Sequence, residues 1–406
     1  MPTKEVYVRV KGCGLVVVML LLGMVTLAVA AAEPIKIGVV SPLGDITGRQ
    51  STRAMQLAVE EINAAGGVLG RPLELIIIDD EMNPAKGAAA IDLLATQHNV
   101  DVFIGGMGSG VHLAQIPRLK IYEKVTVWIG AASSLAEQAL EGCDWYFHIH
   151  PWDYLQGASY VVGWAAIQEE YPMIRIKKAF WAYEEGAFGA SSYQGSLVAH
   201  ADWENTGMSF KSAIVGGGDY RAVLRHAKDV NPDIFIWVGY DADALPIMEQ
   251  AREIGFTPPL FVGSPPGWPA DFGKSPLAEG VILYGMWAPS IKEVSPVSKH
   301  FWDAYIARWN EEPATYFAPL GYTNVYVVAQ AIERAGTLEK AALIAALEAT
   351  EYESPIGETL TFTPSNIIKH QGFQGQKILQ WQDGRQEVLW PFEFATALPR
   401  YPFRWR

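Results

Sequence analysis

One stretch near the start of the chain contains the alternation that decides the fold. It reads IKIGVV at residues 35–40, RAMQLAVEEIN at residues 53–63 and LELIII at residues 73–78. The first and last runs are short and mostly apolar, whereas the middle run places Met55, Val59 and Ile62 at helical spacing. The stretch therefore predicts a strand, a helix and a strand, and strands of this kind indicate a mainly parallel sheet covered by helices on both sides.

The same alternation continues through most of the chain. Asn83-Pro84 supplies a helix cap followed by a proline at the first helical position. Further strands are predicted at residues 102–105, 125–129, 179–183, 210–215, 234–238, 260–263 and 281–284, and further helices at 111–122, 191–205, 220–228, 242–254, 297–309, 322–334 and 338–349. The pattern restarts near residue 179 with the same period, so we expect two α/β lobes with a cleft at the carboxyl ends of their strands.

Only the last 55 residues change character. Short antiparallel strands are predicted at residues 360–362, 377–381 and 388–390, and Asp383-Gly384 reads as a turn between the last two. No low-complexity linker separates the two α/β series. The lobes should therefore form a hinged pair rather than two tethered domains.

The first 32 residues read as a secretory signal peptide. Basic residues at the start precede an uncharged apolar stretch from Leu15 to Val29, and small residues follow as far as Ala32. The apolar stretch, about 15 residues long, is shorter than the ~20 residues that span a bilayer. We expect cleavage after Ala30 or Ala32 and export to the periplasm as a soluble protein, with a retained anchor as the alternative.

The composition excludes several classes of protein. Of the 406 residues, 50% are hydrophobic, which is far too many for a disordered chain. The formal net charge of −13 argues against a nucleic-acid partner, because phosphate binding needs a basic face. After residue 32 the sequence has one cysteine, Cys143, so the exported chain cannot form an intrachain disulfide.

Motifs for catalysis are missing from the sequence. The run from Gly106 to Gly110 offsets its serine from the position that a nucleophile elbow requires, and it lacks the third glycine of the dinucleotide fingerprint. There is no Walker A loop for a nucleotide phosphate either. We therefore expect neither an enzyme nor a bound cofactor, and keep an exported α/β enzyme as a lesser alternative.

Three pairs of polar residues could still do chemistry. His148 and His150 would share one face of a strand and could hold a metal, but no further ligand stands at recognisable spacing, so we favour no metal site. The acid pairs Asp79-Asp80 and Glu184-Glu185 end strands and could act in acid/base work. Adjacent acids on a strand point to opposite faces, and we favour solvated loop charge or helix capping.

Ser109-Gly110 is the most informative motif. It follows a predicted strand and opens a helix, so free backbone N–H groups, a hydroxyl and the positive end of the helix dipole converge there. This arrangement suits a carboxylate or an amide oxygen of a ligand. An ordinary serine cap is the competing interpretation.

Several segments together resemble a known family. They are Ile35-Lys36-Ile37-Gly38, the run from Leu57 to Gly67, the run from Gly70 to Leu75, Asp79-Asp80 followed by Asn83-Pro84-Ala85, Gln156-Gly157, Phe188-Gly189, and the run from Gln250 to Gly255. These segments, spread over roughly residues 34 to 350, resemble the periplasmic leucine/isoleucine/valine-binding proteins of ABC transporters. The resemblance implies the two-lobed type I periplasmic binding fold, with three crossovers joining the lobes and a hinge near residues 149 to 152.

The resemblance also implies how the chain divides. Residues 1–32 are the signal peptide, residues 33–150 plus 285–353 form lobe 1, and residues 151–284 plus 354–406 form lobe 2. Ligand contacts can be transferred by position. The expected set is Ser109, Gly110, Ala131 and Ser133 for the ligand's carboxylate and ammonium, with Phe188, Tyr240 and Trp268 as aromatic walls.

Three departures from the family affect the expected ligand. Where the amino-acid binders usually place an acid for the ammonium, this chain has Ser264 to Trp268, and an unpaired buried ammonium would be costly. The loop from Ser41 to Thr52 is shorter than usual. Met82 and Gly108 stand where the cysteines of a common disulfide would be.

The missing acid and the 14 tryptophans favour a ligand without an ammonium group, such as an aromatic or aliphatic carboxylate or an amide-like solute. We expect a solute-binding protein of an ABC importer that captures a small carboxylate or amide-like solute and delivers it to permease subunits. An amino-acid binder is the first alternative, with the ammonium paired instead to Glu184, Asp241 or Asp243, which all follow strands of the second lobe. A ligand sensor on the same fold is the second.

Overall fold

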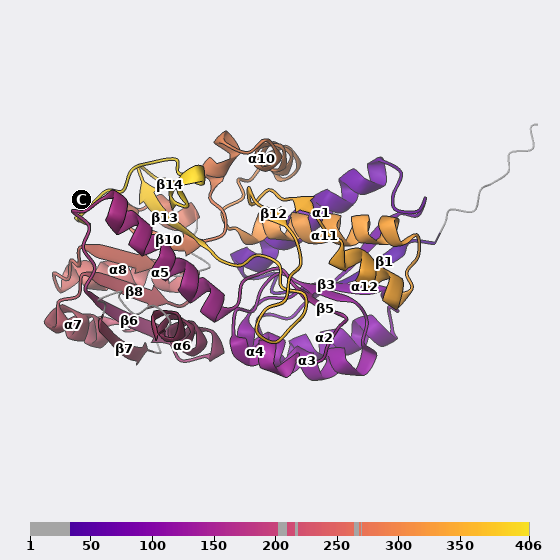
Figure 1. Cartoon of the computed structure of the whole chain (residues 1–406), viewed down its shortest axis with the longest axis horizontal. Coiled ribbons are helices and arrows are strands. Elements are labelled where there is room, and N and C mark those ends of the chain that lie inside the picture. The colour runs from indigo at the N-terminus through magenta and orange to yellow at the C-terminus, as the bar shows by residue number, and fades with distance from the viewer. Residues whose placement is uncertain (1–32, 202–208, 216–217, 264–267, 269, 406) are drawn as a thin grey trace, which may run out of the picture. The chain divides into compact units, whose positions relative to one another are not determined.

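The structure is a computed structural model, and it describes residues 33–201, 209–215, 218–263, 268 and 270–405. The predicted signal peptide lies outside this part of the chain. Residues Glu33–Arg406 form one packed unit that contains two separate large sheets (Figure 1).

The first sheet has five parallel strands in the order β2-β1-β3-β4-β5. Their bounds are β1 Ile35–Ser41, β2 Leu73–Asp79, β3 Val102–Gly105, β4 Thr126–Trp128 and β5 Tyr146–His148. Along β1, Ile37 and Val39 belong to one hydrophobic cluster and Val40 to another, and all three are fully buried. The sheet is therefore covered on both faces, as its apolar strands predict.

Six helices accompany the first sheet. They are α1 Ile46–Ala64, α2 Pro84–Thr96, α3 Ser109–Tyr122, α4 Ser134–Ala139, α11 Phe317–Ala335 and α12 Lys340–Glu348. Helices α1 and α11 pack together on one side of the sheet, and α2 and α3 on the other (Figure 1). The contact of α1 with α11 is so close that a Cβ on Gly321 would lie 2.4 Å from the carbonyl oxygen of Ser51.

The second sheet has seven strands in the order β14-β13-β10-β9-β8-β6-β7. Their bounds are β6 Lys178–Glu184, β7 Ser209–Val215, β8 Ile234–Val238, β9 Leu260–Gly263, β10 Ile282–Gly285, β13 Lys377–Gln382 and β14 Arg385–Trp390. The first five in chain order pair in parallel, and β13 and β14 add an antiparallel hairpin at the β10 edge. Both sheets confirm the prediction of a mainly parallel α/β fold.

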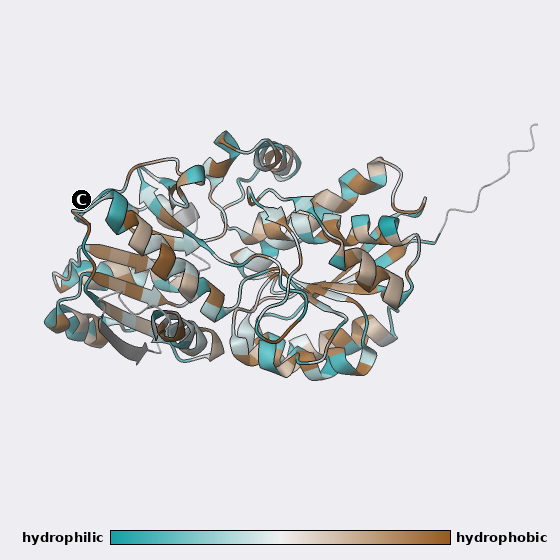
Figure 2. Cartoon of the chain, in the orientation of Figure 1, coloured by the Kyte–Doolittle hydropathy of each residue, from teal (hydrophilic) through white to brown (hydrophobic). Residues whose placement is uncertain are grey.

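The remaining elements surround the second sheet or link it to the first. They are the helices α5 Asp153–Glu170, α6 Ala187–Ala201, α7 Arg221–Val230, α8 Ala244–Glu253, α9 Ala270–Gly273 and α10 Pro296–Trp309, the short strands β11 Tyr352–Glu353 and β12 Thr359–Leu360, and the 3-10 turns Asp241–Asp243, Pro276–Ala278, Pro289–Glu293 and Phe392–Phe394. The helices show a hydrophobic and a hydrophilic side, whereas strands such as β6 and β8 are hydrophobic along most of their length (Figure 2). The chain passes between the two sheets after β5, after β10 and before β13, which gives the three expected crossovers.

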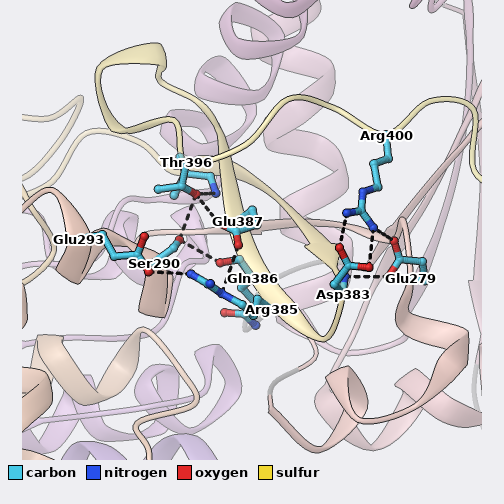
Figure 3. A network of polar contacts seen from close by, with 10 residues as sticks. Glu279, Ser290, Glu293, Asp383, Arg385, Gln386, Glu387, Thr396 and Arg400 are labelled. Atoms are coloured by element: carbon cyan, nitrogen blue, oxygen red, sulfur yellow. Dashed lines mark hydrogen bonds and ion pairs between the residues drawn. The ribbon is translucent and has the colours of Figure 1, made fainter.

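Polar contacts hold the antiparallel hairpin to the rest of the second half (Figure 3). Arg400 pairs with both Asp383, in the turn between β13 and β14, and Glu279. On the other side, Arg385 contacts Glu293 at 2.7 Å. The segment after β14 also packs its main chain on the sheet, because the backbone N–H of Phe403 donates to the carbonyl of Pro259.

Two predictions about helices need correction. The stretch from Ser41 to Thr52 is not a loop, because α1 begins at Ile46 with Asp45 as its cap. The first turns of α1 bury polar residues such as Gln50 and Ser51, so they lack the apolar spacing that marks a helix. Helix α5 was not predicted. Gly157 and Gly163 lie on its packed side against neighbouring segments, so the sequence of α5 shows no continuous apolar stripe.

Candidate functional site

A cavity opens at the carboxyl ends of strands from both sheets. Its empty volume, including the opening to solvent, is about 480 Å³, and the part that the centre of a water-sized molecule can reach is about 50 Å³. The lining residues are Asp45, Thr47, Met82, Met107, Gly108, Ser109, Ala131, Ala132, His150, Phe188, Tyr240, Tyr316 and Phe317. This size suits a small solute rather than a polymer.

The strand orders explain why the cavity lies there. In the first sheet, the chain runs from β1 to β2 on one side and from β3 onward on the other, so the crevice lies outside the ends of β1 and β3. Asp45 follows β1 and Ser109 follows β3. In the second sheet the same reversal falls between β6 and β8, which precede Phe188 and Tyr240 respectively. The cavity therefore lies at the switch points of both sheets.

Ser109 is the first residue of α3, and this helix end is open toward the cavity. No side chain caps α3, and among the described residues no acceptor contacts the backbone N–H groups of Ser109 and Gly110. The Ser109 Oγ accepts the backbone N–H of Ser133 at 3.2 Å, which leaves its own proton to donate. Free N–H groups, a hydroxyl and the helix dipole together favour a negatively charged or carbonyl oxygen.

Glycines before α3 allow this arrangement. Gly106 has φ of +79°, and a Cβ there would lie 1.7 Å from the Nε1 atom of Trp128. Gly108 has φ of +70°, and its Cβ would lie 2.6 Å from the Sδ atom of Met82. Met82 and Gly108 are thus neighbours, as the resemblance to disulfide-bearing proteins implies, and a thioether fills the space between the two loops.

The loop after β4 contributes Ala131, which has φ of +73°. A left-handed backbone is uncommon for a residue with a Cβ, and such strain is concentrated at functional sites. Ser109 and Ala131 line the cavity, whereas Gly110 and Ser133 do not. The Ser133 side chain caps α4 through the backbone N–H of Leu135, and its own N–H positions Ser109, so it acts behind the cavity wall.

The second sheet supplies aromatic side chains. Phe188 and Tyr240 line the cavity, with ring centroids 5.7 Å apart and ring planes inclined by 45°. The backbone N–H of Tyr240 donates to Asp243 at 2.9 Å, which fixes the loop after β8. This wall is therefore aromatic, and Asp243 fixes its loop from outside the cavity.

The acids proposed as ammonium partners have other roles. Glu184 accepts the backbone N–H groups of Gly186 and Gly189 at the start of α6, which confirms helix capping for this residue. Asp243 accepts from Tyr220, Trp237 and Tyr240. Neither carboxylate lines the cavity. The side chain of Asp241 lies outside the described part of the chain.

Trp268 was wrongly placed by the sequence argument. It is fully buried, with its ring 5.1 Å from that of Phe272 and 6.4 Å from that of Phe261. It folds back over the end of β9, where a Cβ on Gly263 would lie 2.5 Å from the indole. It is core packing and not a cavity wall.

Some lining residues were not predicted because they lie far apart in the sequence and meet only in the fold. Three of them form one group. Tyr316 and Phe317 begin α11, and His150 follows β5. The imidazole of His150 stacks beside Phe317 at 5.7 Å, and its Nε2 lies 3.1 Å from the Tyr316 hydroxyl. Burial lowers the pKa of His150 to about 3, so the imidazole is neutral. Only the fold brings these rings together, and no local motif marks them.

The two histidines contact different tyrosine hydroxyls, and one member of the acid pairs is buried. His148 contacts the hydroxyl of Tyr146 at 2.9 Å, while His150 contacts Tyr316. Across residues 33–405, wherever the structure describes the chain, no group of three His, Cys, Asp or Glu could hold a metal ion. Asp80 is buried rather than solvated, and burial raises its pKa to about 6.

Comparison with known proteins agrees with this geometry. A family model described as "Periplasmic binding protein" matches residues 34–386. The chain belongs to the periplasmic binding protein family. Its two switch-point crevices form the site where this family's fold would hold a solute.

Three known proteins illustrate what this chain is similar to, and the third is similar in fold alone. A leucine-, isoleucine-, valine-, threonine- and alanine-binding protein of Pseudomonas aeruginosa is 28% identical over 84% of this chain and 89% of its own. The branched-chain amino acid transporter substrate-binding protein of Streptococcus pneumoniae, solved with isoleucine, has a TM-score of 0.72 and 25% identity over 88% of this chain and 99% of its own. An ABC-transporter solute-binding protein of R. palustris was solved in complex with benzoate. It has a TM-score of 0.72 and 18% identity over 88% of this chain and 95% of its own.

Among the residues that the structure describes, no helix is long and apolar enough to cross a membrane.

Proposed function

We propose that this family member is a periplasmic component of an ABC importer whose solute presents a carboxylate or amide oxygen to the start of α3. The open end of α3 at the cavity supports this proposal most directly, because its N–H groups and the Ser109 hydroxyl have unused donors. Phe188 and Tyr240 would cover the rest of the solute from the second sheet. Residues 1–32 would direct export, and permease subunits would receive the loaded protein.

Closure of two lobes about the crossovers is part of the proposal. Residues 33–150 plus 285–353 and residues 151–284 plus 354–406 would move as the two bodies, with the hinge near residues 149–152. Small-angle scattering should show a smaller radius of gyration when the open protein is saturated with solute. An unchanged profile from an open starting state would contradict hinged closure.

Ser109→Ala tests the proposed anchor. A thermal-shift screen of carboxylates, amides and amino acids first finds a solute, since a ligand at 100 times its Kd stabilises by roughly 2.7 kcal/mol. Calorimetry should then show that Ser109→Ala weakens binding by about 1 to 3 kcal/mol, the range for a hydrogen bond to a charged group.

Ser133→Ala is the matched control. Its hydroxyl caps α4 outside the cavity, so the variant should lose about 1 kcal/mol of stability and retain affinity. Unchanged affinity in Ser109→Ala, or an equal loss in both variants, would contradict an oxygen held at this helix end.

A further inference from the structure

One acidic side chain lines the cavity. Asp45 is the only carboxylate among its lining residues, and none of them is a lysine or an arginine. His150, the other titratable lining group besides the tyrosines, is kept neutral by burial. A solute in this cavity therefore meets a single formal negative charge.

One of the two carboxylate oxygens of Asp45 already accepts hydrogen bonds. Its Oδ1 accepts the backbone N–H of Thr47 at 2.8 Å and the Thr47 hydroxyl, which caps α1. Within the described part of the chain, Oδ2 has no hydrogen-bond partner. A partly buried carboxylate with a free oxygen at a largely apolar cavity is stabilised by a cation or an N–H donor.

The rest of the lining is also suited to a cation. Phe188, Tyr240, Tyr316 and Phe317 all border the same space, and aromatic faces attract ammonium groups. The pKa of Tyr240 is raised, first by burial and then by the charges of Glu184, Asp45 and Asp243. The charge of Asp45 thus reaches the wall that the second sheet contributes.

We infer that Asp45 determines which solutes bind, by pairing its Oδ2 with a protonated nitrogen of the solute. The inference rests on the proposed function, because the solute's oxygen would lie at Ser109 on the same side of the cavity. The solute class is then a small zwitterion or amino-amide, and not a simple carboxylate. Both polar anchors come from the first-sheet half, so the solute can be oriented before the aromatic wall covers it.

Asp45→Asn separates this role from helix capping. Asparagine caps a helix as well as aspartate does, so stability without solute should hardly change. The charge is lost, and the affinity for an ammonium-bearing solute should fall roughly 10- to 100-fold, the range for a charged hydrogen bond. Glu339→Gln is the control, since Glu339 caps α12 away from the cavity and its loss changes the net charge equally.

Calorimetry with leucine, phenylalanine and their deaminated analogues gives the decisive comparison. The wild-type protein should prefer the amino acid in at least one pair, Asp45→Asn should abolish or reverse this preference, and Glu339→Gln should keep it. Equal weakening of both members of a pair by Asp45→Asn, or a wild-type protein that binds neither amino acid, overturns the inference. If the wild type binds only the deaminated carboxylates, and Ser109→Ala loses them, the proposed function is preserved while the role of Asp45 is refuted.

Discussion

The cavity has two walls, one from each sheet. They differ in whether their polar groups already have hydrogen-bond partners. On the first, the α3 N–H groups and the Asp45 Oδ2 have no partner among the described residues. On the second, Glu184 and Asp243 are occupied in holding helix α6 and the Tyr240 loop. The first wall also contains the left-handed residues Gly106, Gly108 and Ala131.

This difference assigns two tasks to the two walls. Unused donors and acceptors on a strained but well-packed backbone give direction and selectivity. Aromatic rings without unpaired polar groups give contact area, which nearly any solute can use. We therefore expect changes in the first wall to alter which solute binds or whether the fold survives, and changes in the second to alter affinity alone.

The largest expected effect is loss of stability in acid, and it should arise in the first-sheet half. Burial lowers the pKa of His112 and His150 to about 3 and holds that of His148 well below its usual value. Because these folded-state pKa values lie below the unfolded value of about 6.5, the stability is complete above pH 6.5 and is lost as the pH falls toward 3. Each histidine contributes a slope of about 1.4 kcal/mol per pH unit.

Two buried acids oppose this slope. Burial raises the pKa of Asp80 and Asp153 to about 6, so between pH 6 and about 4 the folded state takes up their protons and gains stability. Urea unfolding should therefore show a shallow decline from pH 6.5 to 4 and a steep one below pH 4. His112→Gln should reduce the steep slope by one histidine's share, whereas the exposed His226→Gln should not. Equal slopes in all three proteins would show that the acid sensitivity lies elsewhere.

The next effect concerns the backbone of the first wall. Gly106→Ala should destabilise the fold by about 3 kcal/mol or more, because the new Cβ meets Trp128 and the backbone is left-handed. Gly110→Ala is the matched control, since its Cβ would meet nothing within 4 Å and its backbone is helical. Thermal unfolding of both variants measures the contrast. Similar melting temperatures would remove the argument that this wall depends on its glycines.

The smallest effect is expected on the second wall. Phe188→Ala should weaken the binding of every solute by about 1 to 2 kcal/mol, because contact area is lost. The ratio of the affinities for an amino acid and its deaminated analogue should not change. Tyr240→Phe keeps the ring and should leave affinities nearly unaltered. Calorimetry on both variants measures the ratio. A change in that ratio would mean that the second wall also selects, and would end the division of tasks.

Much of the site could be predicted because it follows strands. Strands buried on both faces are visible as apolar runs, and their ends place Ser109, Ala131, Phe188 and Tyr240 at one edge, where all four line the cavity. The helix-start motif alone gave Ser109 an expected role, whereas Ala131 and the aromatic pair needed the resemblance to gain theirs. Those roles stay predictions until a solute is bound.

The errors have physical causes in particular residues. Asp45 was missed because it precedes a helix start with buried polar residues, where no apolar spacing marks the boundary. Trp268 was misread because a post-strand position does not reveal whether an indole faces solvent or turns back onto Phe272. Tyr316 and Phe317 approach His150 only through the packing of α11 on the first sheet.

The contact between Met82 and Gly108 has a consequence for oxidative chemistry. The loop that contains Met82 and the loop before the start of α3 meet through a thioether. The cavity lining has no thiol among the described residues. Reducing agents should therefore leave the site unchanged. Peroxide would act on it instead, because sulfoxide formation at Met82 or Met107 turns an apolar, flexible side chain into a polar one beside the solute. We therefore expect the binding loop to respond to methionine oxidation rather than to disulfide exchange.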